Sequence, residues 1–358
     1  MIHSAGASGT APSPRGASAS PLQRSRPAYV RRNVRTSRLI VLALLVPCAA
    51  LLALSIGSVS LPLSAIVFTL FHPSVVGTSH AIVWDLRLPR VLLAMAVGAG
   101  LGMAGAMLQA MFRNPLVDPY ITGVAAGAAL AASAGFALGV TFALIPALAF
   151  FGGLACATIV AWIGASDGPA GSLRLVLAGV AVSALASAFV TLILLQREQA
   201  GGLNILAWLA GGISGRGWSD LALMAAYLSI GVAAAFSQVH ALNLLRLGSA
   251  AALGFGLTVF AARWRIIAAA ALITAACVSV SGIVGFVGLM VPHVLRRFIG
   301  GDARWLLIGS ALGGAIVVAI ADLLARTVLP PSEVPLGVLL AFVGVPFFLV
   351  IARRPVEL

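Results

Sequence analysis

The sequence contains no lysine, and all 22 of its Lys and Arg residues are arginine. The phosphate-binding loop of P-loop nucleotidases needs a lysine that reaches the nucleotide phosphates, and Schiff-base catalysis needs a lysine amine. The absence of lysine excludes both chemistries for this chain. If ATP drives the protein, a different chain must hydrolyse it.

Charged residues in general are scarce. Nine acidic residues and 9% charged side chains are too few for the surface of a soluble domain. Instead, 61% of the residues are hydrophobic, the mean hydropathy is +1.10, and long apolar windows recur from Leu39 onward. Backbone polar groups inside a bilayer must be satisfied internally, so apolar windows of this length predict helices. The expected fold is an all-α polytopic membrane protein.

The net charge of +13 does not indicate a nucleic-acid partner. Many arginines lie in the first 38 residues, and most of the others flank apolar segments. This is the pattern of the positive-inside rule, under which basic residues gather on the cytoplasmic side of a membrane. The lipid bilayer is therefore the expected partner of these charges.

Cysteines are few, and catalytic motifs are missing. Cys48, Cys156 and Cys277 lie far apart within apolar segments and form no CxxC pair, which argues against a disulfide framework or a zinc site. The sequence has no HExxH and no paired carboxylates of the kind that a membrane-embedded enzyme needs. We expect no catalytic residue, no metal ligand and no cofactor.

The chain divides into three predicted regions. Residues 1–38 are a basic cytoplasmic tail, expected to be disordered and either solvated or touching anionic lipid. Residues 39–354 are the transmembrane domain, and 238–265 form a cytoplasmic loop within it. Placing both termini inside puts most arginines on the cytoplasmic side. Ten membrane segments are expected: 39–57, 91–112, 119–137, 139–164, 174–195, 221–236, 266–282, 284–298, 305–328 and 335–351.

The polar stretch RNPLVDPY, residues 113–120, interrupts the apolar pattern. Pro115 and Pro119 remove backbone donors and end helices, and Asn114 and Asp118 can cap the helix that follows. The stretch is predicted to be a turn at the inner end of segment 91–112, with Arg113 marking the inner face.

A second stretch, SGIVGFVGLMVPHVL at residues 281–295, resembles GAMLQAMFRNPLVDP at 105–119. Both follow a helix rich in Gly and Ala, and both are expected to break at proline, here Pro292. Because the flanking helices run in opposite directions, the pair indicates an inverted repeat of the kind found in transporters. His293 either packs within this short segment or serves as a metal or haem ligand, although no second His or Cys lies at ligand spacing.

Several motifs, in order, resemble the FecCD-type permeases, which are membrane subunits of ABC importers for iron-siderophores, haem and cobalamin. The motifs are LRLPRVLLAMAVGAGLGMAGAMLQAMFRNPLVDPYITGVAAGAAL (86–130), WLAGGISGRGWSDL (208–221), LNLLRLG (242–248), GFVGLMVPHVLRR (285–297), and ADLLAR with PSEVPLGVLLAFVGVPFFLVIARR (321–354). The resemblance implies ten helices per subunit, a homodimer around a central pathway, two cytoplasmic ATPase subunits and an extracytoplasmic binding protein. It also implies a location in the bacterial inner membrane.

In the family that the chain resembles, the arginines of the LRLPR and ADxxAR motifs face acidic side chains of the binding protein. Here they are Arg87, Arg90 and Arg326. Guanidinium groups suit bidentate pairing with carboxylates. The alternatives are interfacial snorkelling or, for Arg326, a pair with Asp322 four residues before it.

The loop LGSAAALGFG, residues 247–256, aligns with the family's coupling helix, which sits in a groove of the ATPase. Gly248 and Gly256 permit tight turns. The family usually has acidic residues after the first glycine, whereas Ser249 and Ala250 stand here. The ATPase contact is therefore expected to rest on packing. The predicted coupling residues are Leu247, Gly248, Ser249, Gly254 and Gly256.

The expected function is that of the permease subunit of a binding-protein-dependent ABC importer for an iron chelate, haem or cobalamin, with no enzymatic activity of its own. The alternative is an ion-coupled secondary transporter, which would carry embedded titratable residues for the coupling ion. Segments 91–112, 139–164 and 266–282 contain no Asp, Glu, His or Arg, which argues against that alternative.

Overall fold

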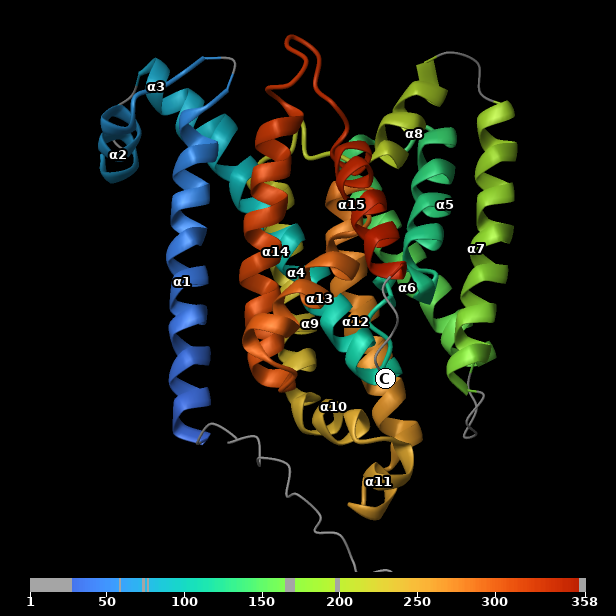
Figure 1. Ribbon diagram of the computed structural model, residues 1–358. Coiled ribbons are helices and arrows are strands. Elements are labelled where there is room, and N and C mark those ends of the chain that lie inside the picture. Colours follow the sequence, from blue (N-terminus) through green and yellow to red (C-terminus); the bar gives the residue numbers. More distant parts are fainter. Residues whose placement is uncertain are drawn as a thin grey trace, which may run out of the picture.

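The computed structural model describes residues 28–57, 59–72, 75, 77–164, 171–196 and 200–353, and this part of the chain contains helices and no strand (Figure 1). The α-helices are α1 (Ala28–Ser55), α2 (Leu63–Phe71), α3 (Thr78–His80), α4 (Leu88–Phe112), α5 (Val124–Ala137), α6 (Ile145–Gly164), α7 (Gly171–Leu195), α8 (Ala200–Ala210), α9 (Trp218–Ser237), α10 (Val239–Arg246), α11 (Ser249–Gly254), α12 (Val259–Ser281), α13 (Val287–Ile299), α14 (Ala303–Ala325) and α15 (Leu336–Ala352). A π-helical stretch, η1 (Ala81–Arg87), leads into α4, and 3-10 turns η2 (Pro119–Thr122) and η3 (Phe142–Leu144) precede α5 and α6.

Within the described ranges, seven helical segments are long and apolar enough to span a membrane. They are 35–55, 78–112, 142–164, 173–195, 218–237, 259–281 and 303–325. Three further segments predicted to span it correspond to α5, α13 and α15, with 14, 13 and 17 residues. At 1.5 Å per residue these are about 20–25 Å long, shorter than the ~30 Å hydrocarbon core. The all-α polytopic fold is confirmed.

Helix α4 is the central helix of the bundle, and glycines let its neighbours approach it. A Cβ atom at Gly98 or Gly102 would collide with backbone atoms of α14, and one at Gly105 would collide with the carbonyl of Gly288 in α13. These contacts bring backbones together at small residues, as is common between membrane helices. The predicted small-residue face of α4 thus packs on α14 and α13.

Two helix breaks meet beside α4, near the middle of the bundle. The first is the 113–123 segment, and the second is 282–286, where Gly282 and Phe286 have positive φ angles of 64° and 68°. The Tyr120 hydroxyl donates to the Val284 carbonyl at 2.8 Å and accepts from the Val284 amide at 2.9 Å. A side chain of the first break therefore satisfies both backbone groups of Val284 in the second, as a bilayer interior requires.

The buried Gln109 of α4 ties the same two breaks together. Its Nε2 atom donates to the carbonyls of Val117, Gly288 and Leu289, at 3.4, 3.2 and 3.1 Å. Its Oε1 atom accepts from Arg296 at 3.2 Å. One amide side chain thus joins the first break to the first turn of α13, which follows the second break.

Three predicted boundaries are wrong. The second break lies before Val287 and not at Pro292, which is inside α13, because Gly282 and Phe286 supply the turn. The tail was predicted to extend to residue 38, but α1 begins at Ala28; residues 1–27 lie outside the described ranges. The loop 238–265 ends at Thr258, since α12 begins at Val259 and carries Arg263 and Arg265 on a helix.

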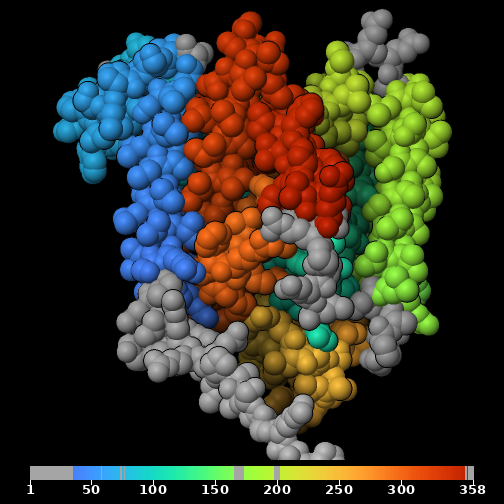
Figure 2. All heavy atoms as spheres, in the orientation of Figure 1, coloured from blue at the N-terminus to red at the C-terminus, as the bar shows by residue number. Residues whose placement is uncertain are grey.

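The two ends of the bundle differ, and we name them by their residues. The arginine end holds Arg87, Arg90 and Arg326, which lie at the end of η1, the start of α4 and the end of α14; the end of α14 is at the top of Figure 1. The α11 end holds α10 and α11 and lies at the bottom. In the same orientation, Figure 2 shows a recess between α15 (red) and α7 (green).

Candidate functional site

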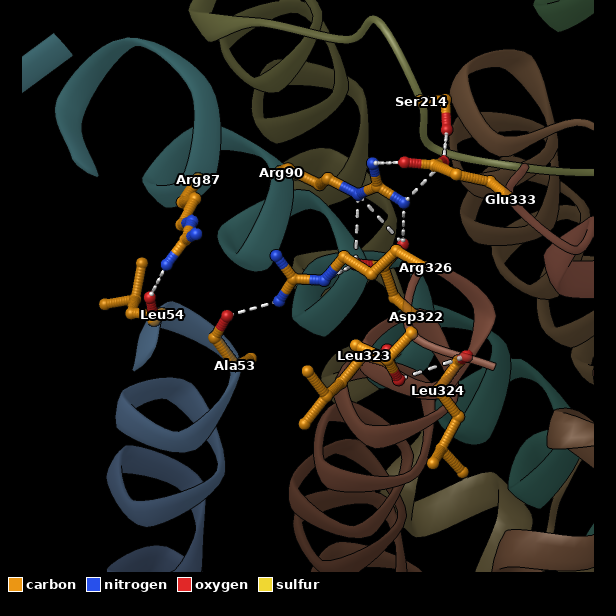
Figure 3. Close-up of polar contacts among 11 residues, drawn as sticks. Ala53, Leu54, Arg87, Arg90, Ser214, Asp322, Leu323, Leu324, Arg326 and Glu333 are labelled. Carbon is orange, nitrogen blue, oxygen red and sulfur yellow. Dashed lines mark hydrogen bonds and ion pairs between the residues drawn. The ribbon is translucent and has the colours of Figure 1, made fainter. Parts of the chain in front are cut away.

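Three arginines that are far apart in the sequence meet at the arginine end (Figure 3). Arg87 ends η1, Arg90 follows in the first turn of α4, and Arg326 caps α14. Two carboxylates join them, Asp322 from α14 and Glu333 from the loop between α14 and α15. We call these five residues the arginine cluster. Its three cations and two anions give it a net charge of one positive.

Arg90 is the centre of the arginine cluster and binds a carboxylate on each side of its guanidinium group. Its Nε atom lies 3.1 Å from both oxygens of Asp322, and its Nη2 atom lies 2.9 Å from Asp322 Oδ1. Its Nη1 and Nη2 atoms donate to the two oxygens of Glu333 at 2.9 and 3.0 Å. Every nitrogen of the group therefore has a carboxylate partner, and both pairings are bidentate.

Arg87 and Arg326 fasten the end of α1 to this cluster. Arg87 donates to the carbonyls of Leu54, at 2.6 Å, and Val59. Arg326 donates to the Ala53 carbonyl and lies 3.8 Å from Asp322. Carbonyls in the last turn of a helix lack intrahelical partners, so two guanidinium groups cap α1.

The two carboxylates differ in their access to solvent. The Asp322 side chain is 2% exposed, whereas that of Glu333 is 39% exposed and also accepts from the Ser214 hydroxyl. Burial raises the pKa of Glu333, but hydrogen bonds from Arg90 and Ser214 lower it more, so its pKa lies below the usual range. Glu333 is consequently anionic at neutral pH.

The sequence places the right arginines together but does not reveal their partners. Arg87, Arg90 and Arg326 were predicted to face another protein, yet each already has partners within the chain. The alternative pair of Arg326 with Asp322 is present. Glu333 and Ser214 were missed as site residues; the signal was a rare acidic residue, in the motif PSEVPLG, a few residues after Arg326.

At the α11 end, a short helix projects beyond the bundle (Figure 1). Gly248 and Gly256, at φ 107° and 79°, turn the chain before and after α11, as predicted, and Gly254 is its last residue. Large apolar side chains are exposed here: Leu247, Leu253 and Phe255. This end therefore offers an apolar surface to a partner.

The base of α11 is held by hydrogen bonds to its neighbours. Arg263 donates to the Ser249 hydroxyl at 3.1 Å, at the position where an acidic residue was expected. Arg246 donates to the carbonyl of Gly301, and Asn243 Oδ1 accepts from the amide of Ala303 at 2.8 Å. Arg263 thus joins α11 to α12, whereas Arg246 and Asn243 belong to α10, so movement of α11 would reach the start of α14 through α10.

A cavity of about 480 Å³ lies at mid-depth between both helix breaks and α7, and one of the predicted turn residues, Asp118, lines it. Asp118 and Tyr120 line it, and Asp118 caps η2 by accepting from the Tyr120 amide at 2.9 Å, with Pro119 as the first residue of η2. The Asn114 side chain accepts from the amide of Leu116 at 2.9 Å, after Arg113 has ended α4 with a φ of 54°. The capping prediction is therefore confirmed for Asp118, whereas Asn114 stabilises the turn at 115–116 and caps no helix.

His293 lies away from this cavity and packs edge-on against Phe347 of α15, with ring centroids 6.2 Å apart. In the described part of the chain, no group of three His, Cys, Asp or Glu residues is placed to hold a metal ion. The packing alternative for His293 fits this geometry.

A bundle of apolar helices, seven of them within the described residues long enough to span a membrane, is typical of the membrane subunit of a transporter. The chain belongs to the FecCD transport family, whose model matches residues 42–354. It is the permease subunit of an ABC importer and a multi-pass inner-membrane protein, and it is a transport component rather than an enzyme.

Relatives agree with this assignment. The hemin transport system permease protein HmuU of Yersinia pestis is 37% identical, over 86% of this chain and 94% of that protein. The Fe(3+) dicitrate permease protein FecD of Escherichia coli is 36% identical, over 88% and 98%. A solved inward-facing ABC transporter structure, described as of the metal-chelate type, has a TM-score of 0.79 at 30% identity, covering 89% of this chain and all of its own.

Proposed function

We propose that this chain carries a metal chelate across the inner membrane as one half of a homodimeric permease, with a binding protein at the arginine end and ATPase subunits at the α11 end. The observation that carries the proposal is the contrast between the arginine cluster at one end and the exposed apolar α11 at the other. Each end suits a different kind of partner.

The orientation follows from charge. The arginine end is named for its three clustered arginines, but it carries few arginines in total. Most of these form ion pairs. The opposite end collects many more: Arg35, Arg38, Arg113, Arg174, Arg246, Arg263, Arg265, Arg296, Arg297 and Arg304. The positive-inside rule then makes the α11 end, with the start of α1, cytoplasmic. The C-terminus is proposed to lie on the same side.

The dimer is proposed to form across the face that carries α7 and α15. Both helices expose large apolar side chains there, among them Leu177, Val180 and Phe189 of α7, and Phe342 and Leu349 of α15. The mid-depth cavity and the recess of Figure 2 lie on this face, so two copies would enclose a pathway between them. Few polar groups line such a pathway, which suits passage rather than retention.

The ATPase is proposed to bind α11. The side chains of Leu247, Leu253 and Phe255 are 63%, 60% and 69% exposed and form an apolar contact surface on a short helix. Aromatic side chains of this kind supply much of the energy of protein interfaces. Because Arg263 engages Ser249, this contact needs no acidic residue after Gly248.

The cargo is proposed to be an iron–siderophore complex, haem or cobalamin. Relatives of this chain are named for hemin, Fe(3+)-hydroxamate, Fe(3+)-citrate and cobalamin import. These cargoes share a large, chelated metal, and recognition of each would rest mainly with the binding protein. An iron chelate is the first choice because most of these names refer to iron.

The test is uptake into liposomes that contain this chain, its ATPase subunit and its binding protein. Labelled haem, cobalamin and ferric siderophores are offered with and without internal ATP. ATP-dependent uptake of one chelate is the expected result. Uptake that ignores ATP and follows a proton or sodium gradient would instead establish the secondary-transporter alternative.

A further inference from the structure

The bond between Arg90 and Glu333 is the exposed half of a two-sided arrangement. Asp322 and Glu333 bind opposite sides of one guanidinium group (Figure 3). Asp322 belongs to α14 and also pairs with Arg326, so it cannot leave without exposing two cations. Glu333 belongs to a loop, and Arg90 is its ion-pair partner among the described residues. Only the Glu333 side of Arg90 can open at low cost.

Glu333 also joins two loops at the arginine end. It accepts from Ser214, which lies between α8 and α9, while Glu333 itself lies between α14 and α15. Ser214 lines a cavity of about 170 Å³, together with Arg216, Trp208 and Gly282. Glu333 thus fastens a loop that borders this cavity.

The fastened loops lead directly to the helices of the proposed pathway. A Cβ atom at Gly337, in the first turn of α15, would lie 2.5 Å from the carbonyls of Ala210 and Ile283. Ala210 ends α8, and Ile283 belongs to the second helix break. The start of α15 is therefore packed against both structures, and a shift of the 329–335 loop would act on them.

We propose that Glu333 is an internal stand-in for a carboxylate of the binding protein. In the free permease it occupies one side of Arg90 and closes the loops, and on docking an acidic side chain of the binding protein takes its place. The inference rests on the proposed docking at the arginine end and adds the group that docking displaces. Once Glu333 is displaced, it would no longer join the 211–217 and 329–335 loops beside the cavity that Ser214 lines.

Electrostatics favours such an exchange. One carboxylate replaces another on the same guanidinium group, so Arg90 is never left without a partner. With Glu333 withdrawn, the net charge of the cluster rises from one positive to two, which attracts an acidic partner more strongly. The depressed pKa of Glu333 agrees with its anionic role in the closed state.

The experiment compares two variants that each remove one negative charge from this end. Glu333→Gln loses the ion pair with Arg90, while Asp85→Asn removes an exposed carboxylate for which no ion pair or hydrogen bond occurs among the described residues. The probe is the binding protein that supports ATP-dependent uptake, titrated onto the full-length permease in lipid nanodiscs. High salt screens the long-range effect of either charge.

The expected result is that Glu333→Gln binds the binding protein about two- to fivefold more tightly than the wild type in high salt, the range of a partly exposed ion pair, and that Asp85→Asn matches the wild type. Ser214→Ala is a second variant that keeps all charges. It should tighten binding less than Glu333→Gln does, because Glu333 loses its bond from Ser214 but keeps Arg90, and it should speed amide hydrogen exchange in residues 211–217.

Equal or weaker binding by Glu333→Gln, in a variant with a normal elution profile, would overturn the inference, because Glu333 would then be structural or part of the docking surface itself. If the wild type binds and transports but Glu333→Gln binds no more tightly, the inference fails and the proposed function stands. If no binding protein docks on the wild-type permease at all, the proposed function fails.

Discussion

The two ends of this permease are each proposed to contact a partner, but they differ in the chemistry of their surfaces. At the arginine end the charged groups are mostly buried and already paired within the chain, Arg90 with both Asp322 and Glu333. At the α11 end the exposed groups are apolar, with Leu253 and Phe255 60% and 69% exposed. One end can bind a partner only by exchanging contacts, and the other can bind by adding them.

The difference follows from the free-energy cost of leaving each kind of side chain without a partner. An unpaired guanidinium group that is largely buried is costly, so the arginine end keeps its own carboxylates until others arrive. Exposed apolar side chains at the α11 end cost little when they are few, and they gain when an apolar groove covers them. The following predictions test this comparison.

The largest effect is expected from changing the aspartates at the two ends of α14. Asp322→Asn leaves Arg90 and Arg326 without their buried partner and should cost about 3–5 kcal/mol of stability. Asp302→Asn at the other end should cost little, because asparagine caps a helix N-terminus as well as aspartate. The unfolding temperature of each purified variant measures both effects. Equal decreases in the two variants would show that the arginine cluster stabilises the fold no more than the helix cap at Asp302 does.

The next effect concerns the apolar side of the comparison. Phe255→Ala should weaken binding of the ATPase subunit about tenfold, as loss of an interface aromatic does. The unfolding temperature should not change, since the side chain is 69% exposed. Leu138→Ala, at an 81% exposed leucine before η3, is the matched control and should leave ATPase affinity unchanged. A loss of stability in Phe255→Ala would mean that α11 needs this ring to fold.

Features that depend on local sequence signals were predicted correctly more often than the ends of helices. The apolar windows, the cap at Asp118 and the turns around α11 could be predicted, because hydropathy, Asp and Gly act locally. The start of α12 was missed because Arg263 and Arg265 suggest a loop, although both lie on a helix that extends past the apolar run. Local signals thus locate helices better than they locate helix ends.

The partners of the arginines could not be predicted, because they come from distant segments. Arg87 binds carbonyls at the end of α1, and backbone carbonyls leave no trace in a sequence. The pairing of Arg90 with Glu333 joins residues 243 positions apart. Pro292 was predicted to end a helix and instead lies within α13, since packing can hold a proline inside a membrane helix.

A smaller effect separates the ends by their response to salt. Binding of the binding protein at the arginine end should weaken about fivefold between about 0.1 M and 0.5 M salt, since ions screen partly exposed charges. Binding of the ATPase at the α11 end should stay constant or strengthen slightly. Titration of each partner at the two ionic strengths checks this. If both affinities change with salt in the same way, the two ends do not differ in binding by charge exchange and by apolar packing.

The smallest effect is a pH dependence confined to the arginine end. The pKa of Glu333 is lowered in the folded protein, so the stability from its ion pair is present above the pKa of an unfolded glutamate, about 4.3, and is lost as pH falls through the folded pKa. Because the side chain is 39% exposed, the effect should be about 1 kcal/mol or less. The measurement is the difference in unfolding temperature between wild type and Glu333→Gln, which should be constant from neutral pH down to about pH 5 and shrink in more acidic solution. A difference that grows on acidification would mean that Glu333 is protonated in its bonds to Arg90 and Ser214, and the exchange of carboxylates on Arg90 would lose its electrostatic basis.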